Sequence, residues 1–468
     1  MNWRELIRDF RLYILLFAAI RLIGITNPPA EVHHGWRQAG TLMMVRAMEE
    51  KGPEIFYPGS AVAGADRWQV IASEMPLYAW TIYASNLITG EAHWMGRLIS
   101  LLACCAGVWS FYRIVRRLLG EQRAFFAGVI LLSSLWFMFG RKVMPDIFSA
   151  SLVLAGIELA WMARMSGRFW MHIPSFALIA VGLLAKMPSV ALLVFLIPLF
   201  ADAGGSLWQR GLIAAYTLLA VILMGAWYFV WVPELLRLGA FQLYWPKTVS
   251  EGWSELIARP QDTMSRFTFT TFYSYTAFPA FITGLFMIRK ERWALRITFI
   301  AALILLTIYM LKVGNCIPEH DYYMIPFAPV MALIAALGLG LLERWPAVSY
   351  LIIAAIAIEG VANQQHDLRL PEEIHYKLNL ASELDEIIPP DEPVAIVGDL
   401  NPQDLYFSDR HGWMAQLNEL NTPEFRSRLN AAGCRHIVIN NRREWLRGIV
   451  PDSSKLVFSG NWRIFAIP

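Results

Sequence analysis

"ALRITFIAALILLTIYMLK" (residues 294–312) is a run of apolar residues whose only charges, Arg296 and Lys312, lie near its two ends. As an α-helix this run is about 28 Å long at 1.5 Å per residue, close to the thickness of about 30 Å of a bilayer's hydrocarbon core. The run therefore predicts a membrane-spanning helix.

Runs of this kind recur along most of the chain. Its 468 residues are 56% hydrophobic and 16% charged, whereas soluble domains carry about 25% charged residues. A single helix over 172–201 would be about 45 Å long, so Lys186-Met187-Pro188 is expected to divide it into a hairpin of two short helices. We expect eleven spans, near residues 11–26, 96–115, 123–140, 145–163, 172–185, 188–201, 211–231, 272–288, 294–312, 323–341 and 346–362. The sequence thus predicts a mainly α-helical, polytopic membrane protein.

Lysine and arginine gather in alternate loops between these segments, which indicates the cytoplasmic side of the bundle. The N-terminus is then cytoplasmic, and its basic and apolar stretch reads as a retained anchor because it lacks a small-residue cleavage site. The opposite side receives the segment 27–95, the loop 232–271 and the chain after residue 363. The basic residues are Arg4, Arg8, Arg11, Arg113, Arg116, Arg117, Arg123, Arg164, Arg168, Arg289, Lys290, Arg292 and Arg296.

Two domains follow from this pattern. Residues 1–363 form the membrane domain, and its outer-face loop 27–95 contains "GTLMMVRAMEE" and "PLYAWTIYASNLITG", which we expect to be amphipathic helices in the membrane surface. Residues 364–468 are more charged and carry short β-type runs, "EPVAIVG", "HIVIN", "KLVFSG" and "WRIFAI", with the helical patterns "ELDEII" and "EFRSRLNAAG" between them. They predict a small soluble α/β domain outside the cytoplasm, in which Gly398-Asp399 is a plausible ligand-binding loop.

Several function classes are disfavoured by composition. A net charge of +3 without a basic stripe argues against a nucleic-acid partner. The four cysteines form no metal-ligand spacing, and adjacent His33 and His34 lack the spacing of a transition-metal site.

Polar residues gather at turns on the predicted outer face. "EVHHGWRQAG" (31–40) contributes Glu31, His34, Trp36 and Arg37, and the same segment contains Glu74. "GRKVMPD" (140–146) contributes Arg141, Lys142 and Asp146; the hairpin contributes Lys186; and "GNCIPEHDYY" (314–323) contributes His320, Asp321, Tyr322 and Tyr323.

Each of these residues also has a structural alternative. Arg141, Lys142 and the tyrosines could anchor spans at the interface, and Lys186 could snorkel. Arg37 could form a structural ion pair with Glu31, Asp146 or Glu74, and Trp36 could pack at the interface.

Glycosyl transfer from a lipid-phosphate sugar needs this set of residue types. A carboxylate can act as general base for the acceptor. Arg or Lys can stabilise the charge that develops on a lipid-phosphate leaving group. An apolar groove between spans would hold the lipid tail.

The motifs "HHGWRQAGT", "IFYPG", "EMPLYAW", "GRLISLL", "YRIVRRLLG", "GRKVMPD", "LLAKMP" and "HDYYMIPFAP" resemble those of the bacterial GT-C glycosyltransferases. These multispan enzymes are related to protein O-mannosyltransferases and to the aminoarabinose transferases of lipid A. The resemblance covers residues 31–330. It implies a sugar donor on polyprenyl phosphate, an envelope acceptor (lipid, glycan or protein), and transfer with inversion on the periplasmic face of the bacterial inner membrane.

The resemblance also implies roles for single residues. Glu31 is the nearest match to the acidic residue of the first outer loop that serves as candidate base, although relatives generally have Asp just before the histidine. Asp146 matches the second acidic position. Arg37, Lys186 and His320 fall on positions for phosphate or substrate contact, where we also place His34, Trp36, Glu74, Tyr322 and Tyr323. No cofactor is required on this reading, and a divalent metal held by Glu31, Asp146 and Asp321 stays open.

Two other functions remain as alternatives: a transporter or flippase of a lipid-linked sugar, and a non-catalytic subunit of glycan assembly. Transporters commonly show inverted repeats and broken helices near the midplane. The absence of a visible repeat and the clustering of polar residues at one face favour the enzyme.

Overall fold

The structure is a computed structural model that describes residues 9–30, 34–61, 63–64, 69–202, 204, 206–243, 246–398 and 402–467. The chain divides into two compact units. We call Met1–Ile25, Met95–Trp231 and Tyr244–Leu368 the helical unit, and Thr26–Trp94, Val232–Leu243 and Arg369–Pro468 the mixed unit. The segment 27–95, which the sequence assigned to the membrane domain, thus clusters with the C-terminal residues.

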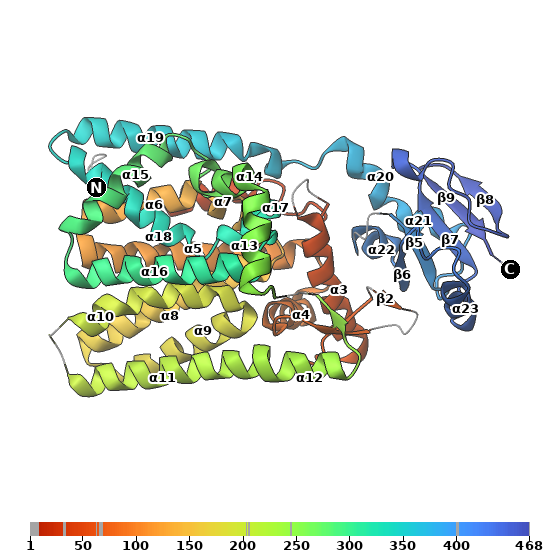
Figure 1. Cartoon of the computed structure of the whole chain (residues 1–468), viewed down its shortest axis with the longest axis horizontal. Helices are drawn as coiled ribbons and strands as arrows, with labels where there is room; N and C mark the ends of the chain where they lie inside the picture. Colours follow the sequence, from red (N-terminus) through yellow and green to blue (C-terminus); the bar gives the residue numbers. More distant parts are fainter. Residues whose placement is uncertain are drawn as a thin grey trace. The chain divides into compact units, whose positions relative to one another are not determined.

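The helical unit is built from long helices that run roughly side by side in Figure 1. Its α-helices are α2 (Phe10–Leu22), α5 (His93–Leu119), α6 (Glu121–Ser133), α7 (Leu135–Phe139), α8 (Pro145–Ser166), α9 (His172–Ala185), α10 (Ile197–Ala201), α11 (Leu207–Ala226), α13 (Val249–Ala258), α14 (Pro260–Ser265), α15 (Ala277–Met287), α16 (Trp293–Val313), α17 (Cys316–Glu319), α18 (Ala328–Leu339) and α19 (Pro346–Asn363). A 3₁₀ helix over Met187–Leu196 joins α9 to α10.

Helices of membrane-spanning length confirm a polytopic membrane protein. Among the described residues, five helices are by length and composition able to cross a bilayer: His93–Leu119, Pro145–Ser166, Leu207–Arg237, Trp293–Val313 and Pro346–Asn363. Three shorter apolar helical segments accompany them, Phe169–Ala185, Met187–Ala201 and Ala328–Leu342. Each of the eleven segments expected from the sequence contains helix, and the number that cross the membrane stays a prediction.

Small residues let two of these helices approach closely. α15 packs along α18, with Gly284 and Gly338 at the crossing. A Cβ on Gly284 would overlap the backbone carbonyl of Ile334, and one on Gly338 would overlap that of Ala280. Close backbone approach at small residues is a common way for helices to associate in a bilayer, where burial of apolar surface gives little driving force.

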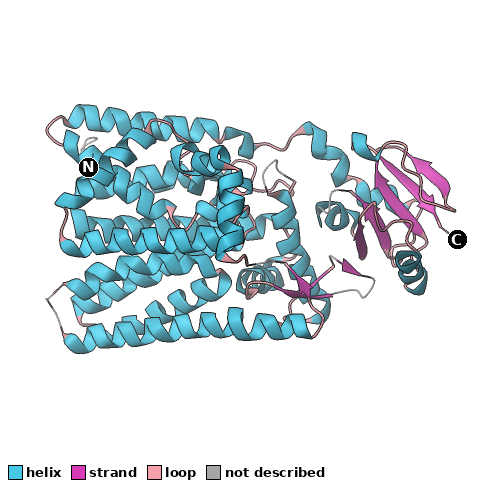
Figure 2. Ribbon diagram, in the orientation of Figure 1, coloured by secondary structure: helices cyan, strands magenta, loops and turns pink. Residues whose placement is uncertain are grey.

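The mixed unit contains helices and two sheets, coloured apart in Figure 2. Its α-helices are α3 (Gly35–Lys51), α4 (Leu77–Thr89), α12 (Val232–Arg237), α20 (His375–Leu378), α21 (Leu380–Asp385), α22 (Pro402–Ser408) and α23 (Pro423–Ala431). Its strands are β1 (Gly59–Ser60), β2 (Ala63–Gly64), β3 (Gln69–Ala72), β4 (Phe241–Gln242), β5 (Val394–Val397), β6 (Gly412–Ala415), β7 (His436–Asn440), β8 (Lys455–Ser459) and β9 (Trp462–Ala466).

The larger sheet has the strand order β2-β6-β5-β7-β9-β8. β5 pairs in parallel with both β6 and β7, and the outer pairings are antiparallel. β5 is buried at every residue, as expected of a central parallel strand. The hydrophobic core formed by this sheet also contains Phe425 and Leu429 of α23. The smaller sheet has the order β1-β3-β4.

The four β-type runs expected in the C-terminal region are confirmed as β5, β7, β8 and β9. The expected helices are found as α21 and α23. The sequence interpretation missed α22 and β6, which are short, and Asp399 of the proposed ligand loop lies outside the described residues.

Candidate functional site

The break between α9 and the 3₁₀ helix positions Lys186. Pro188 has no N–H to continue the helix, so Lys186 adopts an extended conformation, with φ −161° and ψ 109°. The Tyr228 hydroxyl donates to the Leu184 carbonyl (3.3 Å) and accepts from the Met187 N–H (3.2 Å). The polar groups freed by the break are thus satisfied inside the protein, as a membrane segment requires.

A second contact fixes the same turn from α8. The Ser149 hydroxyl lies 2.7 Å from the Gly182 carbonyl, 3.2 Å from the Lys186 carbonyl and 2.6 Å from the Ser189 hydroxyl. Ser149 follows Asp146 by one helical turn, so this contact holds Lys186 opposite the start of α8.

Asp146 and Lys186 form an ion pair in the helical unit. Pro145 occupies the first turn of α8, a position where its missing N–H costs nothing, and Asp146 follows at the positive end of the helix dipole. The Lys186 Nζ lies 3.8 Å from Asp146 Oδ1, and their side chains are 19% and 8% exposed. Asp146 Oδ2 is buried and has no hydrogen-bond partner among the described residues. The pair therefore offers one uncommitted carboxylate oxygen beside a cation.

Aromatic rings stack in the segment that follows α16. The ring of His320 is 5.5 Å from that of Tyr322 and 6.1 Å from that of Tyr323, measured between centroids. Tyr309 of α16 extends the stack, 6.0 Å from Tyr323. The stack thus joins the end of α16 to the segment that follows it.

Arg141 and Lys142 belong to a separate, fully buried cluster. Lys142 Nζ lies 2.7 Å from Asp367 Oδ1, and Arg21 Nη2 donates to Asp367 Oδ2 and to the Met138 carbonyl. Arg141 donates to the backbone carbonyls of Ile23 and Asp367. Arg21, Arg141 and Lys142 are each 0% exposed, so this cluster holds three chain segments together and has no open face for a substrate.

Burial by itself would raise the pKa of Asp367, which lies just beyond α19. The charges of Lys142, Arg21 and Arg141 outweigh that effect and hold the pKa below its usual value of 3.8. Asp367 is thus ionised at neutral pH.

In the mixed unit, the start of α3 is held by a residue far along the chain. His34 has a left-handed backbone (φ 58°) just before Gly35. The Gln403 amide of α22 donates to the Pro29 carbonyl at 2.9 Å, and a Cβ on Gly35 would overlap that amide. A larger residue at position 35 would displace the Gln403 side chain, so this contact favours glycine there.

Arg37 and Glu74 form an ion pair in the mixed unit, with side chains 9% and 13% exposed. Arg37 sits in the first turns of α3, and Glu74 precedes α4. This is one of the structural pairings expected for Arg37. Trp36 is half-buried beside it.

The structure thus groups the predicted site residues by unit. Asp146, Lys186, His320, Tyr322 and Tyr323 lie in the helical unit, and His34, Trp36, Arg37 and Glu74 lie in the mixed unit. Glu31 lies outside the described residues. The described residues contain no group of three or more His, Cys, Asp or Glu that could hold a metal ion.

The sequence interpretation missed Tyr309, Tyr228, Arg21 and Asp367. Tyr309, Tyr228 and Arg21 interrupt apolar runs, which is the signal that could have found them, because polar groups inside a span usually have a functional or structural role. Asp367 lies beyond the last predicted span and carries no such signal.

We compared the chain with known protein families, sequences and structures. Residues 73–231 match the model of the dolichyl-phosphate-mannose-protein mannosyltransferase family. No sequence of a curated protein matches the chain at a significant level.

Solved structures are similar to the whole chain. The apo structure of ArnT from Cupriavidus metallidurans aligns with a TM-score of 0.65 at 14% identity, covering 97% of each chain. The structure of that protein bound to undecaprenyl phosphate aligns with a TM-score of 0.64 at 13% identity, over 97% of this chain and 98% of that one. The apo oligosaccharyltransferase of Archaeoglobus fulgidus aligns with a TM-score of 0.55 at 10% identity, over 92% of this chain and 69% of that one.

These matches confirm the resemblance read from the motifs: the chain shares its fold with ArnT and with the archaeal oligosaccharyltransferase, and its residues 73–231 match the dolichyl-phosphate-mannose-protein mannosyltransferase family model.

Proposed function

We propose that the protein is an inverting glycosyltransferase that moves a hexosyl or pentosyl group from a polyprenyl-phosphate donor to an envelope acceptor at the periplasmic face of the bacterial inner membrane. The observation that carries the proposal is the Asp146–Lys186 pair, in which a buried carboxylate oxygen is uncommitted beside a cation. The fold and the ArnT structure with bound undecaprenyl phosphate support the class of donor.

Asp146 is the proposed general base among the described residues. The acceptor hydroxyl or amine attacks the anomeric carbon on the face opposite the phosphate, the bond from that carbon to the phosphate oxygen breaks, and the acceptor proton moves to Asp146. The free Oδ2 suits this role because it has no hydrogen bond to give up. Glu31 is the alternative base.

Lys186 is the proposed partner of the leaving phosphate. As the bond breaks, the phosphate gains a negative charge, which an ammonium group stabilises. In the free protein Lys186 neutralises Asp146, so donor binding would draw the ammonium toward phosphate and leave the carboxylate more basic. His320, Tyr322 and Tyr323 are proposed to face the sugar, whose C–H groups pack on aromatic rings.

For the mixed unit we propose substrate contact by His34 and Trp36, with Arg37 and Glu74 acting as a preformed pair that orients polar groups of the substrate. The acceptor is a lipid, a glycan or a protein. The steps above use no metal ion.

The test is a transfer assay with purified protein, a radiolabelled polyprenyl-phosphate sugar and membrane acceptors, with mass spectrometry of envelope glycans from cells with and without the protein to choose both substrates. Asp146→Asn should lower the transfer rate by about 10²–10⁴. Lys186→Ala should weaken binding of a short-chain polyprenyl phosphate, and Lys186→Arg should restore part of it.

Matched controls are the exposed Asp452→Asn and Lys455→Ala, which should leave transfer unchanged. Normal transfer by Asp146→Asn would remove that residue from catalysis. Movement of intact lipid-linked sugar across vesicles without product would replace the enzyme by a transporter.

A further inference from the structure

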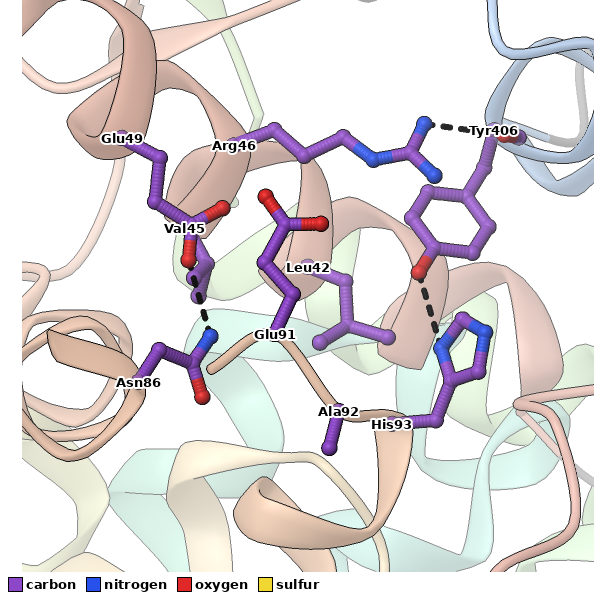
Figure 3. Close-up of a pocket in the computed structure, with 9 residues that line it drawn as sticks. All are labelled: Leu42, Val45, Arg46, Glu49, Asn86, Glu91, Ala92, His93 and Tyr406. Atoms are coloured by element: carbon purple, nitrogen blue, oxygen red, sulfur yellow. Dashed lines mark hydrogen bonds between the residues drawn. The ribbon is translucent and has the colours of Figure 1, made fainter. Parts of the chain in front are cut away.

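A pocket of about 150 Å³ in the mixed unit is lined by none of the residues assigned above to sugar transfer. Its walls come from α3, α4, the residues just after α4, and Tyr406 of α22. Figure 3 shows Arg46, Glu49, Glu91 and His93 gathered with Tyr406 around one space. The pocket thus brings together two carboxyls, a guanidinium, an imidazole and a phenol from separate parts of the chain.

The two carboxyls lie next to each other. Asn86 Nδ2 donates to Glu49 Oε1 at 2.8 Å, and Glu49 also hydrogen bonds to the Glu91 carboxyl. Burial, the largest effect, acts with the neighbouring Glu91 to raise the pKa of Glu49 to about 7, although Asn86 and Arg46 lower it. Two carboxylates this close share a proton because both cannot be charged without repulsion.

Arg46, the cation that lines the pocket, already has partners at Tyr406 and Asp409. Arg46 Nη1 donates to the Tyr406 carbonyl at 3.1 Å, its guanidinium stacks 4.1 Å from the Tyr406 ring, and it forms a 3.0 Å ion pair with Asp409. The Tyr406 hydroxyl lies 3.0 Å from His93 Nδ1. Glu49 and Glu91 therefore line the pocket beside a guanidinium that is already paired with Asp409, and the pocket attracts positive charge.

We propose that this pocket binds a small organic cation, the ammonium group of an amino sugar or of an ethanolamine head group, seated between the carboxyls of Glu49 and Glu91. An ammonium group donates three hydrogen bonds and takes the place of the shared proton. Leu42 and Val45 supply apolar wall for the carbon skeleton. No group of three or more His, Cys, Asp or Glu among the described residues could hold a metal ion, which favours an ammonium group over a metal ion.

Binding should release protons. At pH 7 a group with a pKa of about 7 is half protonated, so displacement of the shared proton frees about half a proton per ligand. A neutral sugar would free none. Proton release thus distinguishes binding of an ammonium group from ordinary hydrogen bonding of a neutral sugar. The measurement needs no sugar donor and no transfer reaction. A negative result would therefore reject the cation site without bearing on the proposed transferase activity.

The experiment is calorimetry of the full-length protein in two pH 7 buffers of different ionisation enthalpy. Glucosamine and phosphoethanolamine are the probes, and N-acetylglucosamine is the uncharged control. Binding of glucosamine with proton release identifies an amino sugar, and binding of phosphoethanolamine identifies a head group. Equal binding of N-acetylglucosamine, no binding of either amine, or tighter binding of Ca²⁺ than of both amines overturns the proposal.

Glu49→Gln and Glu91→Gln keep the shape and remove one charge each. Loss of a charge-assisted hydrogen bond should weaken ammonium binding about ten- to a hundredfold, and Glu49→Gln should abolish proton release. Glu50→Gln is the matched control, since Glu50 follows Glu49 on α3, is 47% exposed and does not line the pocket. Melting temperatures confirm folding, and unchanged affinity in both pocket variants with an intact fold overturns the assignment.

Discussion

At the scale of single residues, Arg37 and Glu74 form an ion pair in which each buried charge depends on the other. Both side chains are largely buried, so removal of one partner leaves the other desolvated. We expect Arg37→Gln and Glu74→Gln each to lower the free energy of unfolding, and the double variant to lose less than the sum, with a coupling energy of about 0.5–3 kcal/mol. Denaturant unfolding in detergent measures all three, and additive losses would show that the two side chains act independently.

Glu49 makes stability depend on pH. Its folded pKa of about 7 lies above its usual 4.5, so the folded protein keeps a proton that the unfolded chain releases. The free energy of unfolding should therefore fall as pH rises from 4.5 to 7. Melting temperatures at pH 5, 6 and 7 should decline less steeply in Glu49→Gln than in wild type or in the control Glu50→Gln. Parallel declines in all three proteins would contradict the raised pKa.

At the scale of elements, Asp367 joins segments that are far apart in sequence. It contacts Arg21 of α2 and Lys142 of the turn before α8, and it lies just after α19. Asp367→Asn removes the negative charge that neutralises the buried Arg21, Arg141 and Lys142. We expect it to lower the free energy of unfolding by about 3–5 kcal/mol. Thermal unfolding in detergent measures the loss, with Asp452→Asn as the surface control.

The sign of the pH effect at Asp367 is opposite to that at Glu49. Its folded pKa lies below 3.8, so its stabilisation is present at neutral pH and is lost as pH falls through and below that value. Melting temperatures of wild type and Asp367→Asn should therefore converge in acid. A constant difference down to pH 3 would show that the carboxylate is not the source of the stability.

At the scale of the whole molecule, the distribution of basic loops predicts which parts are outside the cytoplasm. A reporter fused after residue 363, where α19 ends, should be active only outside, and one inserted at Gly120, between α5 and α6 in the basic region 113–123, only inside. Activity of both reporters on one side would reject the eleven-span arrangement and the periplasmic location of the candidate site.

Much of the molecule was predictable from local patterns. Long apolar runs, the break at Pro188 and the β-type runs of the C-terminal region depend on neighbouring residues, because span length, a missing N–H and strand alternation are local properties. The motifs around Asp146 and Lys186 were visible for the same reason. The roles of these residues remain predictions, since an ion pair is compatible with catalysis and with structure.

The sequence by itself determined the class of fold, the apolar helical segments and the residue types of the candidate site. Only the tertiary structure decided the partners: Glu74 for Arg37, Asp367 for Arg21 and Lys142, Glu91 for Glu49. It also showed that the segment 27–95 clusters with the C-terminal residues, through contacts such as that of Gln403 with Pro29. The physical reason is that hydrophobic patterning is read from consecutive residues, whereas the pairing of buried charges depends on distances between segments that lie tens to hundreds of residues apart in the chain.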